Sequence, residues 1–153
     1  MNSLFILTSA LNTKFGVYTN DQRLQQTIES FDSIKKHCPG ADIAIVEMAG
    51  IPPTELQLQT YYQNADYVLN YSEDQNVQDI YHSTENWDIV KNCTEVLMFA
   101  HALTALTEQG VISKYDRIFK MTARYYLTDA FDPAYYDTVP DQTVILERKA
   151  SQF

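Results

Sequence analysis

The stretch ADIAIVEMAG, residues 41–50, decides the fold. It is a short apolar run, rich in β-branched residues, that ends at Glu47 and Gly50, which is typical of a strand buried on both faces. Such strands belong to parallel sheets, because helices cover both faces of a parallel sheet. The stretch therefore predicts an α/β protein, and the segments on either side of it agree.

A strand and a helix precede this stretch. Residues 3–9, SLFILTS, form another short apolar run and are predicted to be the first strand. Residues 21–38 are predicted to be a helix that ends at Pro39-Gly40, with Thr19 or Asn20 as its cap and Gln22 completing a capping box with Thr19. Its apolar stripe consists of Leu24, Ile28, Phe31 and Ile34.

A helix and a strand also follow. The segment after Pro52-Pro53 begins a second helix, with Thr54 as its cap, and residues 66–72, DYVLNYS, form a third strand. The first 72 residues thus have the order β-α-β-α-β. This order predicts a parallel sheet with right-handed crossovers.

The remaining residues extend the same architecture. Polar residues 73–84 are predicted to be a loop, and a helix over residues 85–109 follows, capped by Ser83 or Thr84. The face of this helix that points inward is predicted to consist of Val90, Cys93, Leu97, Ala100 and Leu103 or Thr104. Residues 115–122 form a fourth strand and residues 143–148 a fifth, at an edge. We expect a single domain over residues 1–153.

Composition narrows the classes of partner. With 20 acidic and 11 basic side chains the formal net charge is -9, which argues against nucleic-acid binding but leaves room for a local cationic pocket. The opening apolar run is too short for a membrane span and lacks a charged leader, so we expect a cytoplasmic protein. Cys38 and Cys93 are expected to be reduced, buried thiols.

Ligands of open parallel sheets bind beyond the carboxyl ends of the strands. This rule selects Thr8 and Ser9, Glu47, residues 70–72 and residues 122–126. The segment DRIFKMTARYYLTDAFD, residues 116–132, brings Lys120 and Arg124 there. Because arginine offers bidentate contacts to phosphate and lysine a point charge, an anionic ligand is predicted. The alternative is that both cations form ordinary ion pairs with Asp116, Asp129 or Asp132.

Several common signatures are missing. The chain has four glycines and neither a dinucleotide-binding glycine motif nor a phosphate-binding loop, and it has no GxSxG elbow. The nearest approach to metal-ligand spacing is Asp79, His82 and Glu85, for which chance is the simpler explanation, so no metal site is predicted.

Four segments together carry a family resemblance: residues 3–9, residues 21–47, KNCTEVLMFAHAL at 91–103 and YDRIFKMTARYYLTDAFD at 115–132. They resemble the nucleotide-sugar half of GT-A glycosyltransferases, in particular the short glycosyltransferase-like proteins of bacteria and large tailed phages. The resemblance covers roughly residues 3–135. It implies a mostly parallel, Rossmann-like sheet of the GT-A type, a nucleoside-diphosphate sugar as donor, an unknown acceptor and, for a viral protein, the host cytoplasm.

The resemblance also implies roles for residues. Thr8 and Ser9 would contact the nucleotide, and Glu47 the base or ribose. Arg23 and Lys91 would lie near the phosphates or brace the site, and Thr122 would also bind the nucleotide sugar. Tyr125 with Tyr126 would stack on the sugar or base or pack beneath the loop. The structural alternatives are that Thr8 only ends a strand, that Arg23 is a solvated helix residue and that Lys91 pairs with Glu95.

One departure from the family concerns the metal. GT-A enzymes usually present a DxD carboxylate after this strand, but the chain has no DxD and places Arg124 near that position. Fixed cations can stabilise a departing diphosphate as a metal does, so transfer without a DxD-bound metal is predicted, with Lys120 and Arg124 on the phosphate oxygens. Manganese is not excluded. Asp129 and Asp132 are the candidates for the catalytic base.

A second departure concerns length. Only some 20 residues follow Pro133, so the acceptor-binding half of a typical GT-A enzyme is largely missing. Two alternatives stay open: a minimal glycosyltransferase, with a homodimer as one way to complete its acceptor site, and a non-catalytic module that binds a nucleotide sugar or another protein. A nucleotidyltransferase is less favoured, because the chain lacks an acidic pair for its metal.

Overall fold

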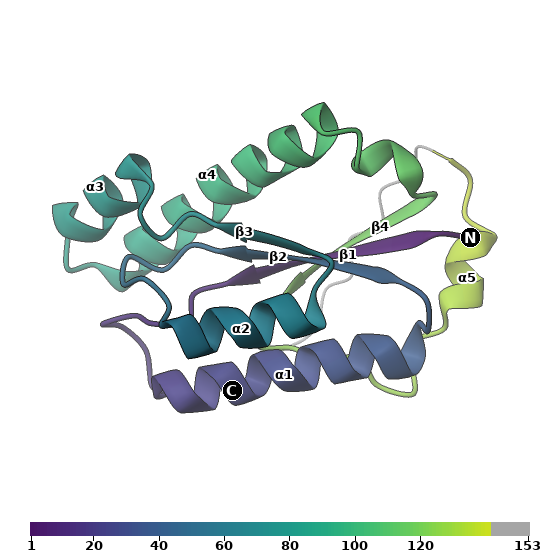
Figure 1. Cartoon of the computed structure of the whole chain (residues 1–153), viewed down its shortest axis with the longest axis horizontal. Coiled ribbons are helices and arrows are strands. Elements are labelled where there is room, and N and C mark those ends of the chain that lie inside the picture. The colour runs from purple at the N-terminus through teal and green to yellow at the C-terminus, as the bar shows by residue number, and fades with distance from the viewer. Residues whose placement is uncertain (142–153) are drawn as a thin grey trace.

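Four parallel strands form the centre of the molecule, with helices on both faces (Figure 1). The structure is a computed structural model that describes residues 1–141. Its elements are β1 (Ser3–Ser9), α1 (Asn20–His37), β2 (Asp42–Glu47), α2 (Glu55–Asn64), β3 (Tyr67–Asn70), α3 (Gln75–Ser83), α4 (Trp87–Glu108), the 3-10 turn η1 (Ile112–Lys114), β4 (Arg117–Thr122) and α5 (Pro133–Asp137).

The strand order is β3-β2-β1-β4, and every pair is parallel. This confirms the predicted α/β class with a parallel sheet, and the topology is consistent with a Rossmann-like fold. The chain moves from β1 outward to β2 and β3, and it then crosses to the other side of β1 to form β4. Residue Ser9 pairs with Glu47 and Thr8 with Thr122, so three strands end at the same level. The direction of winding switches between β1 and β4.

Alternation along the strands divides the core in two. On β1, Phe5 and Leu7 face α1 and α2, whereas Leu4 and Ile6 face α3 and α4, and all four side chains are fully buried. Figure 1 shows the two pairs of helices on opposite sides of the sheet. Burial on both faces explains why the strands are continuously apolar.

The start of α1 follows the sequence prediction. The hydroxyl of Thr19 accepts from the backbone N–H of Gln22, whose side chain accepts from the N–H of Thr19, so the capping box is confirmed. Thr54 forms the same motif at α2. Of the predicted apolar stripe of α1, Phe31 and Ile34 are fully buried, whereas Leu24 and Ile28 are partly exposed.

A row of hydroxyl side chains on α1 holds the loop after β4. The hydroxyls of Thr27 and Ser30 donate to the carbonyls of Ala123 and Tyr125, and the hydroxyl of Ser33 accepts from the N–H of Leu127. All three hydroxyl residues are buried. The path of this loop is therefore fixed by main-chain contacts.

The predicted loop over residues 73–84 is wrong, because residues 75–83 form α3. Asp74 caps this helix by accepting from the N–H of Asn76. Its buried side chains are Val77 and Tyr81, which lie one helical turn apart. Because the residues between and around them are mostly polar, the sequence showed no apolar stripe and a loop was predicted.

The predicted inward face of α4 is right for Val90, and Leu97 and Leu103 are partly buried against the core, but Cys93 and Ala100 are exposed. The buried residues of this helix are Val90, Thr94, Met98, Ala102 and Leu106, and its cap is Asn86, not Ser83 or Thr84. The helix is apolar on most of its surface, so the pattern did not identify the face on the sheet. As a consequence, Cys93 is exposed, although it was predicted to be buried. Cys38 is buried as predicted.

The predicted fifth strand, residues 143–148, lies outside the described residues. Among residues 1–141, no helix combines the length and the apolar character that crossing a membrane requires.

Candidate functional site

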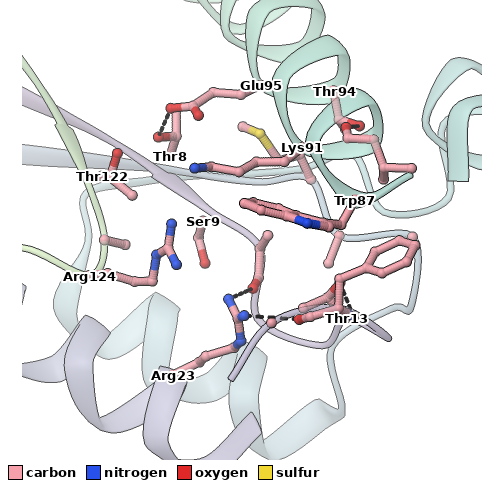
Figure 2. Close-up of a pocket in the computed structure, with 18 of the residues that line it drawn as sticks. Thr8, Ser9, Thr13, Arg23, Trp87, Lys91, Thr94, Glu95, Thr122 and Arg124 are labelled. Atoms are coloured by element: carbon pink, nitrogen blue, oxygen red, sulfur yellow. Dashed lines mark hydrogen bonds between the residues drawn. The ribbon is translucent and has the colours of Figure 1, made fainter. Parts of the chain in front are cut away.

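A cavity of about 130 Å³ lies at the carboxyl ends of β1 and β4, beside the first turns of α4 (Figure 2). The end of β1 contributes Thr8 and Ser9 to its wall, and the end of β4 contributes Thr122 and Arg124. This is the point where the winding of the sheet switches direction, which is the usual place for a ligand in an open parallel sheet.

Two cationic side chains extend into the cavity from different elements, Lys91 from α4 and Arg124 from the loop after β4 (Figure 2). The ammonium group of Lys91 lies 5.9 Å from the centroid of the Trp87 ring. In residues 1–141 the guanidinium of Arg124 has neither a hydrogen bond nor an ion pair. A partly buried guanidinium without an anionic partner is expected to attract one.

Arg23 is a third cation on the cavity wall, but its role is internal. Its guanidinium donates to the carbonyls of Ala10 and Phe15, at 3.3 and 3.1 Å, and more weakly to that of Tyr18. Burial, and next the charge of Arg124, lower the pKa of Arg23. Arg23 therefore shapes the loop after β1 and adds to the positive potential of the site.

Gly16 makes this arrangement possible. Its φ is +98°, in the left-handed region that favours glycine, and a Cβ there would lie 2.4 Å from Nη2 of Arg23. A larger residue would therefore displace the guanidinium that organises the loop.

The opposite side of the cavity is apolar and aromatic. Phe15, Met48, Tyr81 and Trp87 contribute to it. Tyr81 lies directly over Gly50, because a Cβ on Gly50 would come within 2.2 Å of the Tyr81 ring. An apolar wall beside a few convergent polar groups is the usual composition of a small-molecule site.

We expect the variant Gly50→Ala to lose about 2–3 kcal/mol of unfolding free energy, because its methyl group overlaps the ring of Tyr81. The variant Gly40→Ala is the control: its φ of +89° adds strain of about 1 kcal/mol, but no atom lies within 4 Å of the new Cβ. Urea unfolding compares the two variants. Equal or smaller destabilisation in Gly50→Ala would show that Tyr81 is not held against Gly50.

One acidic residue of the cavity, Glu95 on α4, was not predicted as a site residue. Its Oε1 accepts from the Thr8 hydroxyl at 2.9 Å and from the ammonium group of Lys120. Burial would raise the pKa of Glu95, but the hydrogen bond and charge of Lys120 and the Thr8 hydroxyl outweigh it, so the pKa is lowered. Glu95 was missed because the predicted inward face of α4 did not include its side of the helix. With Thr94 and Met98 buried, Glu95 lies at the edge of the buried face.

The structure brings together six of the predicted site residues: Thr8, Ser9, Arg23, Lys91, Thr122 and Arg124 all line the cavity. Lys91 thus faces the cavity, and Arg23 is not a solvated helix residue.

Glu47 does not line the cavity. Its side chain is fully buried, its Oε1 accepts from the N–H groups of Leu11 and Ala49, and its Oε2 accepts from the Tyr61 hydroxyl at 2.9 Å. The Tyr61 hydroxyl also lies 2.8 Å from Oγ of Ser9. Burial raises the pKa of Glu47. This carboxyl group joins the ends of β1 and β2, and it is fully buried behind the cavity lining.

The other predicted residues also lie outside the cavity lining. Lys120 pairs with Glu95, so it is neither a free phosphate ligand nor paired with one of the three aspartates considered. Tyr125 is 53% exposed on the loop surface. Asp129 pairs with Lys36 at 3.0 Å near the end of α1, which lowers the pKa of Asp129, and Asp132 caps α5. The two candidate bases are therefore engaged away from the cavity.

Over the described range, no three His, Cys, Asp or Glu side chains gather in a way that could hold a metal ion. What the cavity offers chemically is fixed positive charge next to an aromatic wall. Comparison with known proteins adds nothing to this description: no family model, curated protein or solved structure matches the chain significantly.

Proposed function

We propose that the chain binds a nucleoside-diphosphate sugar at the ends of β1 and β4, and that it transfers the sugar to an acceptor without a DxD-bound metal. The observation that carries the proposal is the guanidinium of Arg124, which has no hydrogen bond or ion pair within residues 1–141 and shares the cavity with the ammonium group of Lys91. Lys91 is close enough to Glu95 to help lower the pKa of that carboxyl group, whereas no carboxylate among residues 1–141 forms an ion pair with Arg124. The two cations supply the contacts that a diphosphate needs.

The aromatic wall supports a nucleotide rather than a simple anion. Phe15, Tyr81 and Trp87 provide surfaces on which a base or sugar ring can pack. The cavity volume of about 130 Å³ is smaller than the roughly 300–1,000 Å³ of sites that enclose whole ligands, so the cavity would enclose only part of the donor. The remainder of the donor would lie at the open mouth of the cavity. The family resemblance over residues 3–135 points to the same ligand class.

In the transfer step, Lys91 and Arg124 would stabilise the charge that develops on the departing diphosphate. This replaces the predicted pair of Lys120 and Arg124, because Lys120 is held by Glu95. A second candidate function, a binding module without turnover, is favoured by one observation: Asp129 and Asp132, the predicted bases, lie outside the cavity.

Thermal unfolding in the presence of UDP, GDP and their sugars, with and without manganese, tests the proposal. We expect one of these nucleotide families to raise the midpoint without manganese, because a ligand at 100 times its Kd adds about 2.7 kcal/mol of stability. Release of free sugar or its transfer to an acceptor separates an enzyme from a binding module. If none of the nucleotides shifts the midpoint, the proposed function is wrong.

A further inference from the structure

Glu95 is the one acidic side chain among the described residues that line the cavity. A carboxylate in this position repels a diphosphate, so its presence in a phosphate site needs a reason. The negative charge of Glu95 is neutralised by Lys120 on β4, which forms an ion pair with Glu95 but does not line the cavity itself. The pair therefore adds no net charge to the site, and it leaves a carboxylate at the wall.

The two oxygens of Glu95 are used differently. Oε1 takes both the Thr8 hydroxyl and the Lys120 ammonium group, whereas Oε2 receives no hydrogen bond from residues 1–141. The side chain is 25% exposed, so it remains accessible from the cavity. Because its pKa is lowered, Glu95 stays ionised at neutral pH, where a carboxylate accepts hydrogen bonds and donates none. A low pKa also makes it a weak general base.

We propose that Glu95 is a specificity residue that accepts a hydrogen bond from a hydroxyl of the ligand, so that the site prefers sugar-bearing diphosphates to bare pyrophosphate. Lys120 is its positioning residue. This inference rests on the proposed function. It assigns a contact to the hydroxyl groups of the ligand, whereas the cations contact its phosphates. Hydroxyl-to-carboxylate hydrogen bonds are short and strong, and a site built around one discriminates against ligands that lack the hydroxyl.

Calorimetric titration of the full chain with pyrophosphate, UDP-glucose and GDP-mannose tests the inference. In the variant Glu95→Gln we expect affinity for the better-bound sugar nucleotide to fall about tenfold, because a charge-assisted hydrogen bond is lost. Affinity for pyrophosphate should stay level or rise, because Lys120 is then unneutralised. The variant Glu108→Gln, at the exposed end of the same helix, is the matched control and should change neither affinity.

The pair also makes a prediction about charge. Lys120→Met leaves Glu95 without its counter-charge and should weaken pyrophosphate binding about tenfold. The double variant Lys120→Met/Glu95→Gln restores the neutral sum and should bind pyrophosphate about as well as the unmodified chain. A purely structural role of Lys120 would not give this recovery, since the double variant lacks the ion pair altogether.

Two results would overturn the inference while the proposed function stands: equal losses for pyrophosphate and sugar nucleotide in Glu95→Gln, or no loss for either. Failure of the unmodified chain to bind any of the three probes would instead remove the proposed function, and the inference with it.

Discussion

Replacing Arg124 with alanine is expected to lower the affinity for the bound sugar nucleotide about 100-fold. The guanidinium faces the cavity without a hydrogen bond or ion pair from the described residues, so its contacts with phosphate oxygens would be made mainly with the ligand. Two charge-assisted hydrogen bonds at about 1.5 kcal/mol each account for a loss of this size. Calorimetric titration at low ionic strength measures it, because salt screens such contacts.

The same variant should gain stability in the absence of ligand. Arg124 lowers the pKa of Arg23, which means that the two guanidinium groups repel one another. Since Arg124 is partly exposed, the relief is worth less than about 1 kcal/mol, and the midpoint of thermal unfolding should rise by roughly 1–3 °C. Weaker binding combined with higher stability distinguishes a ligand contact from a residue that merely supports the fold.

Two further variants complete this test. Arg124→Lys keeps the charge but loses the bidentate geometry, so we expect intermediate affinity. Lys114→Ala removes an exposed cation from η1, which precedes β4 and therefore lies at the amino-terminal end of that strand, away from the cavity, and the variant should bind normally. If Arg124→Ala binds as tightly as the control, the cavity is not the phosphate site.

The largest loss of stability is expected from Glu47→Ala, at about 3–5 kcal/mol of unfolding free energy. The substitution leaves the N–H groups of Leu11 and Ala49 and the Tyr61 hydroxyl without their acceptor in a fully buried place. Tyr61→Phe removes only one donor and should cost about 1–2 kcal/mol. Urea unfolding measures both. An undiminished stability together with lost nucleotide affinity would return Glu47 to the ligand site where the sequence placed it.

The dependence on pH provides an independent check of Glu47. Burial raises its pKa in the folded state, so between its ordinary value of 4.5 and the raised value the folded protein binds more protons than the unfolded one. Glu47 therefore contributes less to stability as the pH rises through that window and more as the pH falls. The stability of the unmodified chain relative to Glu47→Gln should be greater at pH 5 than at pH 8. A difference that is constant with pH would show that Glu47 is not perturbed by burial.

Local signals were sufficient for most of the fold. The apolar runs of β1 and β2, the capping box of Thr19 and the cap residue Thr54 identify strands and helix starts without any tertiary information. The same reasoning failed for α4, which is apolar on most of its surface and so gives no clear inward face, and for α3, whose two buried residues are separated by polar ones.

The site was predictable only in part, and for a physical reason. The carboxyl-end rule led to Thr8, Ser9 and Arg124, which do line the cavity, since the rule depends on strand direction alone. The partners of the charged residues depend on packing between distant elements: Lys120 meets Glu95 across 25 positions of sequence, and Glu47 meets Tyr61 across 14. No periodicity records such pairs, so the sequence could not separate a ligand contact from a structural one.

The hydroxyl row of Thr27, Ser30 and Ser33 has a consequence for how this site could change. These side chains hold the segment after β4 by hydrogen bonds to the backbone of residues 123, 125 and 127, and such bonds do not depend on the side chains at those positions. The intervening positions 124 and 126 are thus interchangeable without disturbing the course of the backbone. Mutation or design can therefore change the side chains at positions 124 and 126, and with them what the site binds, while the backbone of this loop keeps its path.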